Sequence, residues 1–213
     1  NSAGSHGIVH GFSGDYREDY YIGHNIVKGA AANSSSGIRI DDQANFISLY
    51  NNIIYDFSGT AGHGIELYNV DYGVYNNTSI DNTVGFRGPG VGSPNSYIKN
   101  NLLIDNGTDT TNASFANSAT NITSDGTSPD GGAFQNQTTV KFVDRNNDDF
   151  RLAHDDTQAK NRGTALSTGQ EHNFITDNMG HSRAIDGNWD IGAHEAANEI
   201  FRSMGYNNTA SIQ

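Results

Sequence analysis

The first half of the chain is built from short runs in which large apolar residues alternate with small or polar ones. The runs Phe46–Tyr50 and Ile53–Tyr55 are typical, and each is only a few residues long. Alternation of this kind marks a β-strand with one buried face, whereas the spacing of an amphipathic helix is absent from residues 5–125. The pattern predicts an all-β structure made of many short strands.

Two features return at nearly constant intervals. One is an Asn that follows another Asn or a His, at intervals of 27, 25 and 24 residues: Asn25, Asn52, Asn77 and Asn101. The other is a Gly at the head of a short strand: Gly7, Gly37, Gly64 and Gly85. Each interval holds three short strands, which is the pattern of a parallel β-helix, a solenoid of stacked coils. We expect an Asn ladder, because Asn tolerates the left-handed backbone of a sharp corner and its amide can hydrogen-bond along a stack.

Composition narrows the possible partners. The chain has 213 residues, enough for one domain with a sizeable core, and a net charge of −12. So acidic a surface argues against nucleic acid or an anionic membrane as a partner. No apolar run approaches the ~18 residues of a membrane span. The chain has no Cys, which excludes a disulfide framework and thiolate chemistry.

Two segments of the second half occur in a recognisable order, KFVDRNNDDFRL at residues 141–152 and RAIDGNWDIGAHE at residues 183–195. With them, residues 37–195 resemble bacterial secreted right-handed parallel β-helix proteins of the pectate-lyase-like superfamily, in which a DFRL segment precedes a closing DIGAxE. The usual Ser-Pro-Ala-Ile-Asp between the two segments is replaced here by HDDTQAKNRGTAL. The resemblance implies an all-β, right-handed, single-stranded parallel β-helix that is secreted or held at the cell surface.

We expect coils over residues 1–125 and a loop-rich C-terminal capping region of the same domain over residues 126–213. An end of a solenoid exposes core and unpaired strand edges, so this region is expected to cover an end. Residues 105–139 are interpreted as a loop-rich excursion around a last, degraded coil. A short helix is expected over residues 193–205. The stretch DRNNDD at residues 144–149 begins like a calcium loop but lacks its Gly, and we interpret it as a structural turn.

Alternation within the Gly-headed strands predicts a charged row on one sheet. The outward residues of three successive coils, about 4.8 Å apart, are Arg39, Glu66 and Arg87. They follow residues of one register that should point inward, namely Ile38, Ile65 and Phe86. One interpretation of the row is a surface salt-bridge ladder. The other is a saccharide site, in which Arg neutralises a uronate carboxylate and a nearby base removes the C5 proton.

The first functional hypothesis is a polysaccharide lyase that cleaves an acidic (uronate) polysaccharide by β-elimination. Its catalytic residues would be Arg39, Glu66, Arg87 and His63, of which His63 could act as acid or base. Tyr68 and Asn69 would contact the sugar. Assistance from Ca²⁺ is possible, because Asp41, Asp42 and Asp71 would offer the hard oxygen ligands that suit this ion.

Two alternatives stay open. A non-catalytic glycan-binding or surface module would use the same face without turnover, and the short solenoid and acidic surface favour it. A polygalacturonase-type hydrolase is suggested by Asp41–Asp42 and by the Gly-His-Gly at residues 62–64. The Asp pair follows its strand, however, whereas the Gly-His-Gly precedes one. The remaining histidines are scattered and give no helical zinc spacing, apart from His6 and His10 in an expected strand.

Overall fold

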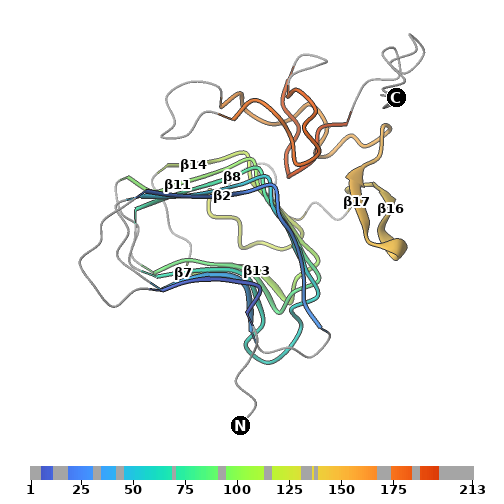
Figure 1. Cartoon of the computed structure of the whole chain (residues 1–213). Coiled ribbons are helices and arrows are strands. Elements are labelled where there is room, and N and C mark those ends of the chain that lie inside the picture. Colours follow the sequence, from blue (N-terminus) through green and yellow to red (C-terminus); the bar gives the residue numbers. More distant parts are fainter. Residues whose placement is uncertain are drawn as a thin grey trace, which may run out of the picture.

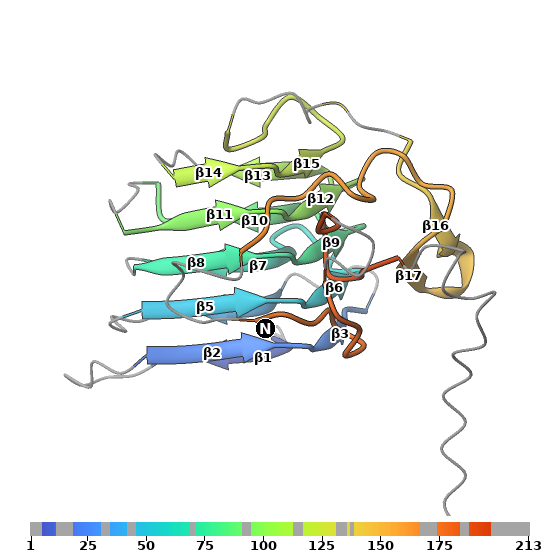
Figure 2. The ribbon, with the colours of Figure 1, turned by 90° about the horizontal axis from the view of Figure 1, so that it is seen from above.

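The structure, a computed structural model, describes residues 6–11, 19–30, 35–41, 46–68, 71–90, 95–112, 117–130, 136, 139–166, 174–183 and 188–196. These residues form a parallel β-solenoid, in agreement with the predicted fold class (Figure 1). Three parallel sheets of five strands each make up its sides. We call them sheets A, B and C. Each coil contributes one strand to each sheet, in that order along the chain, and the chain winds in the right-handed sense (Figures 1 and 2).

The strands of the three sheets are short, as the sequence predicts. Sheet A contains β1 (Ile8–His10), β4 (Ser36–Ile40), β7 (His63–Leu67), β10 (Val84–Arg87) and β13 (Thr108–Thr111). Sheet B contains β2 (Asp19–Gly23), β5 (Phe46–Tyr50), β8 (Tyr72–Tyr75), β11 (Tyr97–Lys99) and β14 (Asn117–Ala119). Sheet C contains β3 (Ile26–Lys28), β6 (Ile53–Tyr55), β9 (Thr78–Ile80), β12 (Leu102–Ile104) and β15 (Ile122–Thr123).

The register confirms the predicted stacking of residues from successive coils. Ile38 on β4 pairs with Ile65 on β7, which pairs with Phe86 on β10. All three side chains are completely buried in the core that the sheets enclose. Because neighbouring residues of a strand point to opposite faces, the residue after each of them lies on the outer face of sheet A.

The corner between sheets B and C is made by a residue in the left-handed conformation. The backbone angle φ is 55° at Asn51, 49° at Asn76 and 57° at Asn100. In the first and last coils the same position is taken by His24 (φ 60°) and Thr120 (φ 55°). Asn adopts this conformation more readily than most residues, which explains why the first Asn of each pair recurs.

The second Asn of each pair forms the predicted ladder inside the corner. The Nδ2 atom of Asn52 donates to Oδ1 of Asn77 at 2.9 Å, and Asn77 makes the same contact to Asn101 at 3.0 Å. Each of these amides also donates to a strand carbonyl, so its polar atoms are satisfied although it is buried. The complete ladder runs through Asn25, Asn52, Asn77, Asn101 and Asn121 and ends on the carboxylate of Asp130.

A second ladder, which the sequence analysis missed, lies at the corner between sheets C and A. Here Asp81 and Asp105 take the left-handed conformation, with φ of 57° and 55°. The residues that follow them form the stack, because Nδ2 of Asn82 donates to Oδ1 of Asn106 at 3.1 Å. Asn106 in turn donates to Oδ1 of Asp109 at 2.9 Å, so this ladder also ends on a carboxylate.

The Gly-headed strands owe their glycines to close packing at the same corner. A Cβ atom on Gly37 would lie 2.2 Å from a methyl group of Ile54 on sheet C and 2.8 Å from the carbonyl oxygen of Gly64. A Cβ atom on Gly64 would lie 2.6 Å from the carbonyl oxygen of Gly85. Only glycine lets the backbones of stacked coils approach this closely.

From residue 139 onward, the described part of the C-terminal region packs along the side of the solenoid. It contains an antiparallel hairpin of β16 (Phe142–Asp144) and β17 (Asp149–Leu152), and irregular segments that cross successive coils (Figure 2). Its buried residues cover the apolar outer face of sheet C: Phe150, Leu152, Ala159, Ile191 and Ala193 against Ile53, Tyr55, Ile80, Leu102 and Ile104. Leu166, Phe174 and Trp189 pack against Tyr75 of sheet B.

Residues 127–130 of the predicted capping region bond to the last coil, at Thr110, Ser118 and Asn121, whereas the described residues from 139 onward lie along the side of the solenoid. The physical reason is that sheet C has apolar residues on both faces and must be covered on its outer side. Hydrogen bonds from the left-handed Asn residues fix this cover. The Nδ2 atom of Asn51 donates to the carbonyl of Thr176 at 2.7 Å, and that of Asn100 donates to the carbonyl of Thr164 at 2.7 Å.

Three smaller expectations have mixed outcomes. Residues 105–139 contain a coil of three regular strands, so the last coil is less degraded than expected. Residues 193–196, the start of the expected helix, form no helix, and the rest of that segment lies outside the described residues. The structural turn at residues 144–149 is confirmed as the connection of the β16–β17 hairpin, a 3₁₀ turn over Arg145–Asn147 followed by Asp148 with φ of 60°.

Candidate functional site on the outer face of sheet A

The outer face of sheet A carries the predicted charged row in register. Arg39 pairs with Glu66, and Glu66 pairs with Arg87, on the neighbouring strands β4, β7 and β10. Val9 and Thr111 extend the row on β1 and β13. The structure thus brings three of the four predicted catalytic residues together on one surface.

Glu66 is the centre of this group and is only 3% exposed, although it lies on an outer face. Its Oε1 accepts hydrogen bonds from the Tyr68 hydroxyl at 2.6 Å and from Nη1 of Arg87 at 2.7 Å. Its Oε2 accepts from Oγ of Ser36 at 2.6 Å and from Nη1 of Arg39 at 3.3 Å. The carboxylate is therefore buried by the groups that bind it, with both oxygens saturated.

These contacts decide the protonation state of Glu66. Burial by itself would raise its pKa, but the hydrogen bonds from Ser36 and Tyr68 and the nearby charges outweigh it, and the pKa lies below the usual 4.5. An ionised carboxylate whose oxygens are already occupied is a poor general base. Glu66 is better described as the group that positions Arg39, Tyr68 and Arg87.

The two arginines and Tyr68 form the accessible part of the site. The side chains of Arg39 and Arg87 are 31% and 30% exposed. Their guanidinium carbons lie 5.3 Å and 4.9 Å from the centre of the Tyr68 ring, and Arg87 also donates to the Tyr68 hydroxyl. Burial, followed by the bond to Glu66, raises the Tyr68 pKa, so its hydroxyl stays protonated at neutral pH.

His63 opens β7 and lies at the edge of this group. Its Nδ1 is 3.7 Å from Oε1 of Glu66 and, among the described residues, has no hydrogen-bond partner. Burial lowers the pKa of His63 even though the charge of Glu66 opposes the shift, so the ring is neutral at pH 7. A neutral imidazole can accept a proton.

The predicted metal ligands do not form a group among the described residues. Nε of Arg39 donates to both carboxylate oxygens of Asp41, at 2.8 and 2.9 Å, which places Asp41 beside the charged row. Asp71 accepts a hydrogen bond from Asn95 instead. Asp42 and the predicted sugar contact Asn69 lie outside the described residues. The calcium site stays a prediction.

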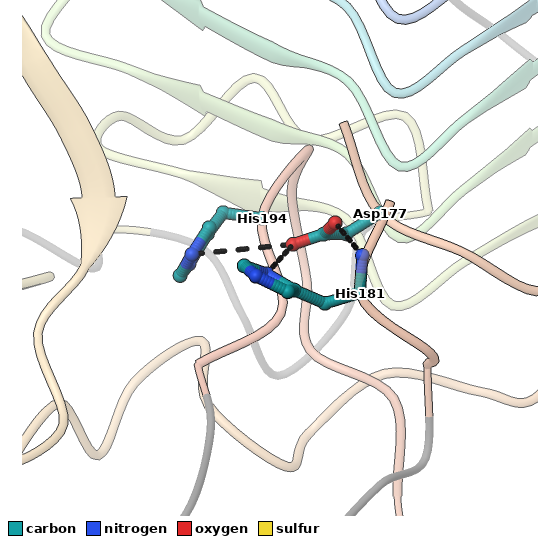
Figure 3. Close-up of side chains that lie close together, drawn as sticks. All are labelled: Asp177, His181 and His194. Carbon is teal, nitrogen blue, oxygen red and sulfur yellow. Dashed lines mark hydrogen bonds and ion pairs between the residues drawn. The ribbon is translucent and has the colours of Figure 1, made fainter. Parts of the chain in front are cut away.

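Two features of functional interest were missed. Ser36 binds Glu66, and the only sequence signal for it is its place next to Gly37 at the head of β4. The second feature is a group in the C-terminal region formed by Asp177, His181 and His194 (Figure 3). The spacing of four between Asp177 and His181 was a possible signal, but His194 joins them only through the fold.

The described part of the chain contains no helix with the length and apolar character that a membrane span requires. Comparison of the chain with protein-family models, with curated proteins and with solved structures finds no match.

Proposed function

We propose that the outer face of sheet A binds an acidic glycan through Arg39, Tyr68 and Arg87. The observation that supports this most is the pair of partly exposed guanidinium groups held on the strands that flank β7, with Tyr68 between them. Arg offers planar, bidentate hydrogen bonding to carboxylate or sulfate groups, and an aromatic ring offers an apolar surface to a sugar ring.

The buried Glu66 makes this surface suitable for binding. A guanidinium group has five N–H donors, and only Nη1 of Arg87 is used in its hydrogen bonds to described residues. Because Glu66 fixes both arginines, less side-chain entropy is lost when a ligand binds. The positive charges of Arg39 and Arg87 are balanced by Asp41 and Glu66, so we expect binding that depends on geometry more than on net charge.

A second candidate function is β-elimination at the same surface, as a polysaccharide lyase. It is favoured by the position of His63, whose Nδ1 lies 3.7 Å from the Glu66 carboxylate that holds both arginines, since elimination needs a base beside a group that neutralises the uronate carboxylate. In this hypothesis Arg39 or Arg87 neutralises the carboxylate and His63 removes the C5 proton. Glu66 and Tyr68 position these groups.

Calorimetric titration of the whole chain with pectate, alginate and glycosaminoglycan oligosaccharides tests the binding. We expect Arg39→Ala and Arg87→Ala to weaken binding at least about tenfold, which corresponds to roughly 1.4 kcal/mol. Arg151→Ala is the matched control, because Arg151 is a partly exposed arginine on the C-terminal hairpin, paired with Asp149. Equal affinity in all three variants, or no binding to any of these glycans, contradicts the proposal.

Absorbance of the unsaturated product, measured with and without Ca²⁺, separates the two candidate functions. A lyase should form this product, and His63→Ala should abolish its formation while leaving binding within a few-fold of wild type. Binding without any unsaturated product leaves the non-catalytic function alone. New reducing ends without the chromophore would support a hydrolase instead.

A further inference from the structure

Three side chains with metal-binding atoms converge in the C-terminal region, away from the site on sheet A. Oδ2 of Asp177 lies 3.2 Å from Nδ1 of His181 and 3.9 Å from Nε2 of His194 (Figure 3). All three atoms lie within 4.8 Å of one another, and no other group of three such residues forms among the described part of the chain. None of these residues has a part in the glycan site.

The framework around this group is fixed by the backbone. Asp177 is fully buried, and its Oδ1 accepts hydrogen bonds from the amides of Met179 and His181 at 2.9 and 2.7 Å. Its Oδ2 accepts from the amide of Glu195 at 3.0 Å, which joins the turn after Asp177 to the segment that carries His194. The Asp177 side chain is therefore held in place before any ion arrives, and the backbone beside His194 is tied to it.

The third side chain, that of His181, leaves the site accessible to an ion from solvent. The side chain of His181 is 55% exposed, whereas those of Asp177 and His194 are 0% and 10% exposed. A small rotation of the exposed imidazole can adjust its distance to the other two ligands, and solvent can occupy a further coordination position on the same side. This is the arrangement of a site with three protein ligands and an open fourth position.

We propose that Asp177, His181 and His194 bind one divalent ion of the zinc class. Two imidazole nitrogens and one carboxylate oxygen suit Zn²⁺, whereas Ca²⁺ takes six to eight oxygen ligands. Tetrahedral coordination with bonds of ~2.0–2.2 Å places ligand atoms about 3.3 Å apart, close to the 3.2 and 3.9 Å found here.

Metal binding has a structural consequence at the hairpin. Nδ1 of His194 accepts a hydrogen bond from the amide of Leu152 at 3.2 Å, so the neutral ring carries its proton on Nε2. When Nε2 binds an ion, that proton is lost and Nδ1 becomes the protonated nitrogen. The bond to Leu152 must then break, which couples the ion to β17 and gives a readout independent of any activity.

Calorimetric titration of the chelator-treated whole chain with Zn²⁺ tests the site. We expect one ion per chain, an increase in melting temperature with Zn²⁺, and faster hydrogen exchange at the Leu152 amide. His181→Ala should fold, because its side chain is exposed, and should bind Zn²⁺ at least about tenfold more weakly. His154→Ala, which removes an exposed histidine of the same region, is the control and should bind like wild type.

Several outcomes overturn the proposal. They are the absence of Zn²⁺ binding by a folded wild-type chain, unchanged affinity in His181→Ala, and a loss of affinity in His154→Ala equal to that in His181→Ala. A melting-temperature increase with Ca²⁺ that depends on His181 would overturn the assignment to the zinc class. Protection of the Leu152 amide that is unchanged by saturating Zn²⁺ would exclude His194 as a ligand through Nε2.

Discussion

Asn51 and Asn52 are neighbours of the same residue type, yet the fold uses them differently. Asn51 supplies the left-handed backbone of the corner and turns its amide outward to Thr176, while Asn52 turns its amide inward to Asn77. The spacing of the pairs was enough to predict a ladder. It could not assign these separate roles, because they depend on φ and on the direction of each side chain, which identical residues do not reveal.

Loss of a ladder amide should be costly, because the groups that bind it cannot reach water. Asn77→Ala removes the acceptor for the backbone and side-chain N–H groups of Asn52, which are buried. We expect a loss of about 2–4 kcal/mol in the free energy of unfolding, measured by urea denaturation. Asn147→Ala, at an exposed position of the hairpin turn, should change it by no more than about 0.5 kcal/mol. Similar losses in both variants would contradict the buried ladder.

A side chain at position 37 should destabilise the protein. Gly37→Ala places a methyl group 2.2 Å from Ile54, and the coils must separate to accept it. We expect a loss of about 1–3 kcal/mol in the free energy of unfolding. Gly11→Ala is the control, since its Cβ would meet nothing closer than 3.7 Å, and its melting temperature should stay close to that of wild type.

At the scale of the strands, alternation was sufficient to predict the outer row of sheet A. Arg39, Glu66 and Arg87 were placed correctly because a period of two and a constant coil length fix which side chains stack. The burial of Glu66 could not be predicted, because it depends on Ser36 and Tyr68 closing over the carboxylate. The row is therefore partly a salt-bridge ladder, as one interpretation held, with a buried centre.

The stability of the protein should depend on pH through Glu66, the buried centre of this row. Because the pKa of Glu66 is lower in the folded chain than its usual 4.5, its contribution is fully present above that value and is lost as the pH falls through the folded pKa. Glu66→Gln lacks this contribution. We expect wild type to be more stable than Glu66→Gln at pH 7, by about 1–3 kcal/mol, and the difference to shrink below pH 4.5.

The effect of Asp109 on stability should change with pH in the direction opposite to that of Glu66, which makes it an internal comparison. Burial raises its pKa despite the hydrogen bonds it accepts, so its ionised form is disfavoured in the folded chain. Stability relative to Asp109→Asn should therefore rise as the pH falls through the folded pKa of Asp109. Urea midpoints for both pairs of proteins over an acidic pH series measure the two slopes, and slopes of the same sign would contradict these assignments.

At the scale of the whole molecule, the C-terminal region is part of the solenoid's packing. Its sequence was interpreted as a cap because a solenoid end needs cover, but β6, β9 and β12 are buried on both faces. Two of these strands, β6 (Ile-Ile-Tyr) and β12 (Leu-Leu-Ile), are continuous apolar runs, a signal that was present in the sequence and was not used. The exact partners of the region come from residues 125 positions apart, which no local pattern reveals.

Arg183 should hold this region to the coils. Its side chain is fully buried and donates to Oε2 of Glu195, to Oδ1 of Asn51 and to the carbonyl oxygens of Asp190 and Gly192. Arg183→Met leaves the buried Glu195 carboxylate without its cationic partner, and we expect a loss of about 3–5 kcal/mol in the free energy of unfolding. Limited proteolysis should then release fragments from the C-terminal region first. A variant as protease-resistant as wild type would show that the apolar contacts are sufficient.

The two stacks of amides have a direction, because each one donates to the next and the last partner is Asp130 or Asp109. A carboxylate has no proton to offer, so another asparagine placed beyond it would bring oxygen against oxygen. Each ladder of asparagine side chains therefore cannot continue beyond its terminal aspartate. Exposed strand edges otherwise invite further chains to add. The terminal acids should keep this end from serving as a template for fibre-like assembly.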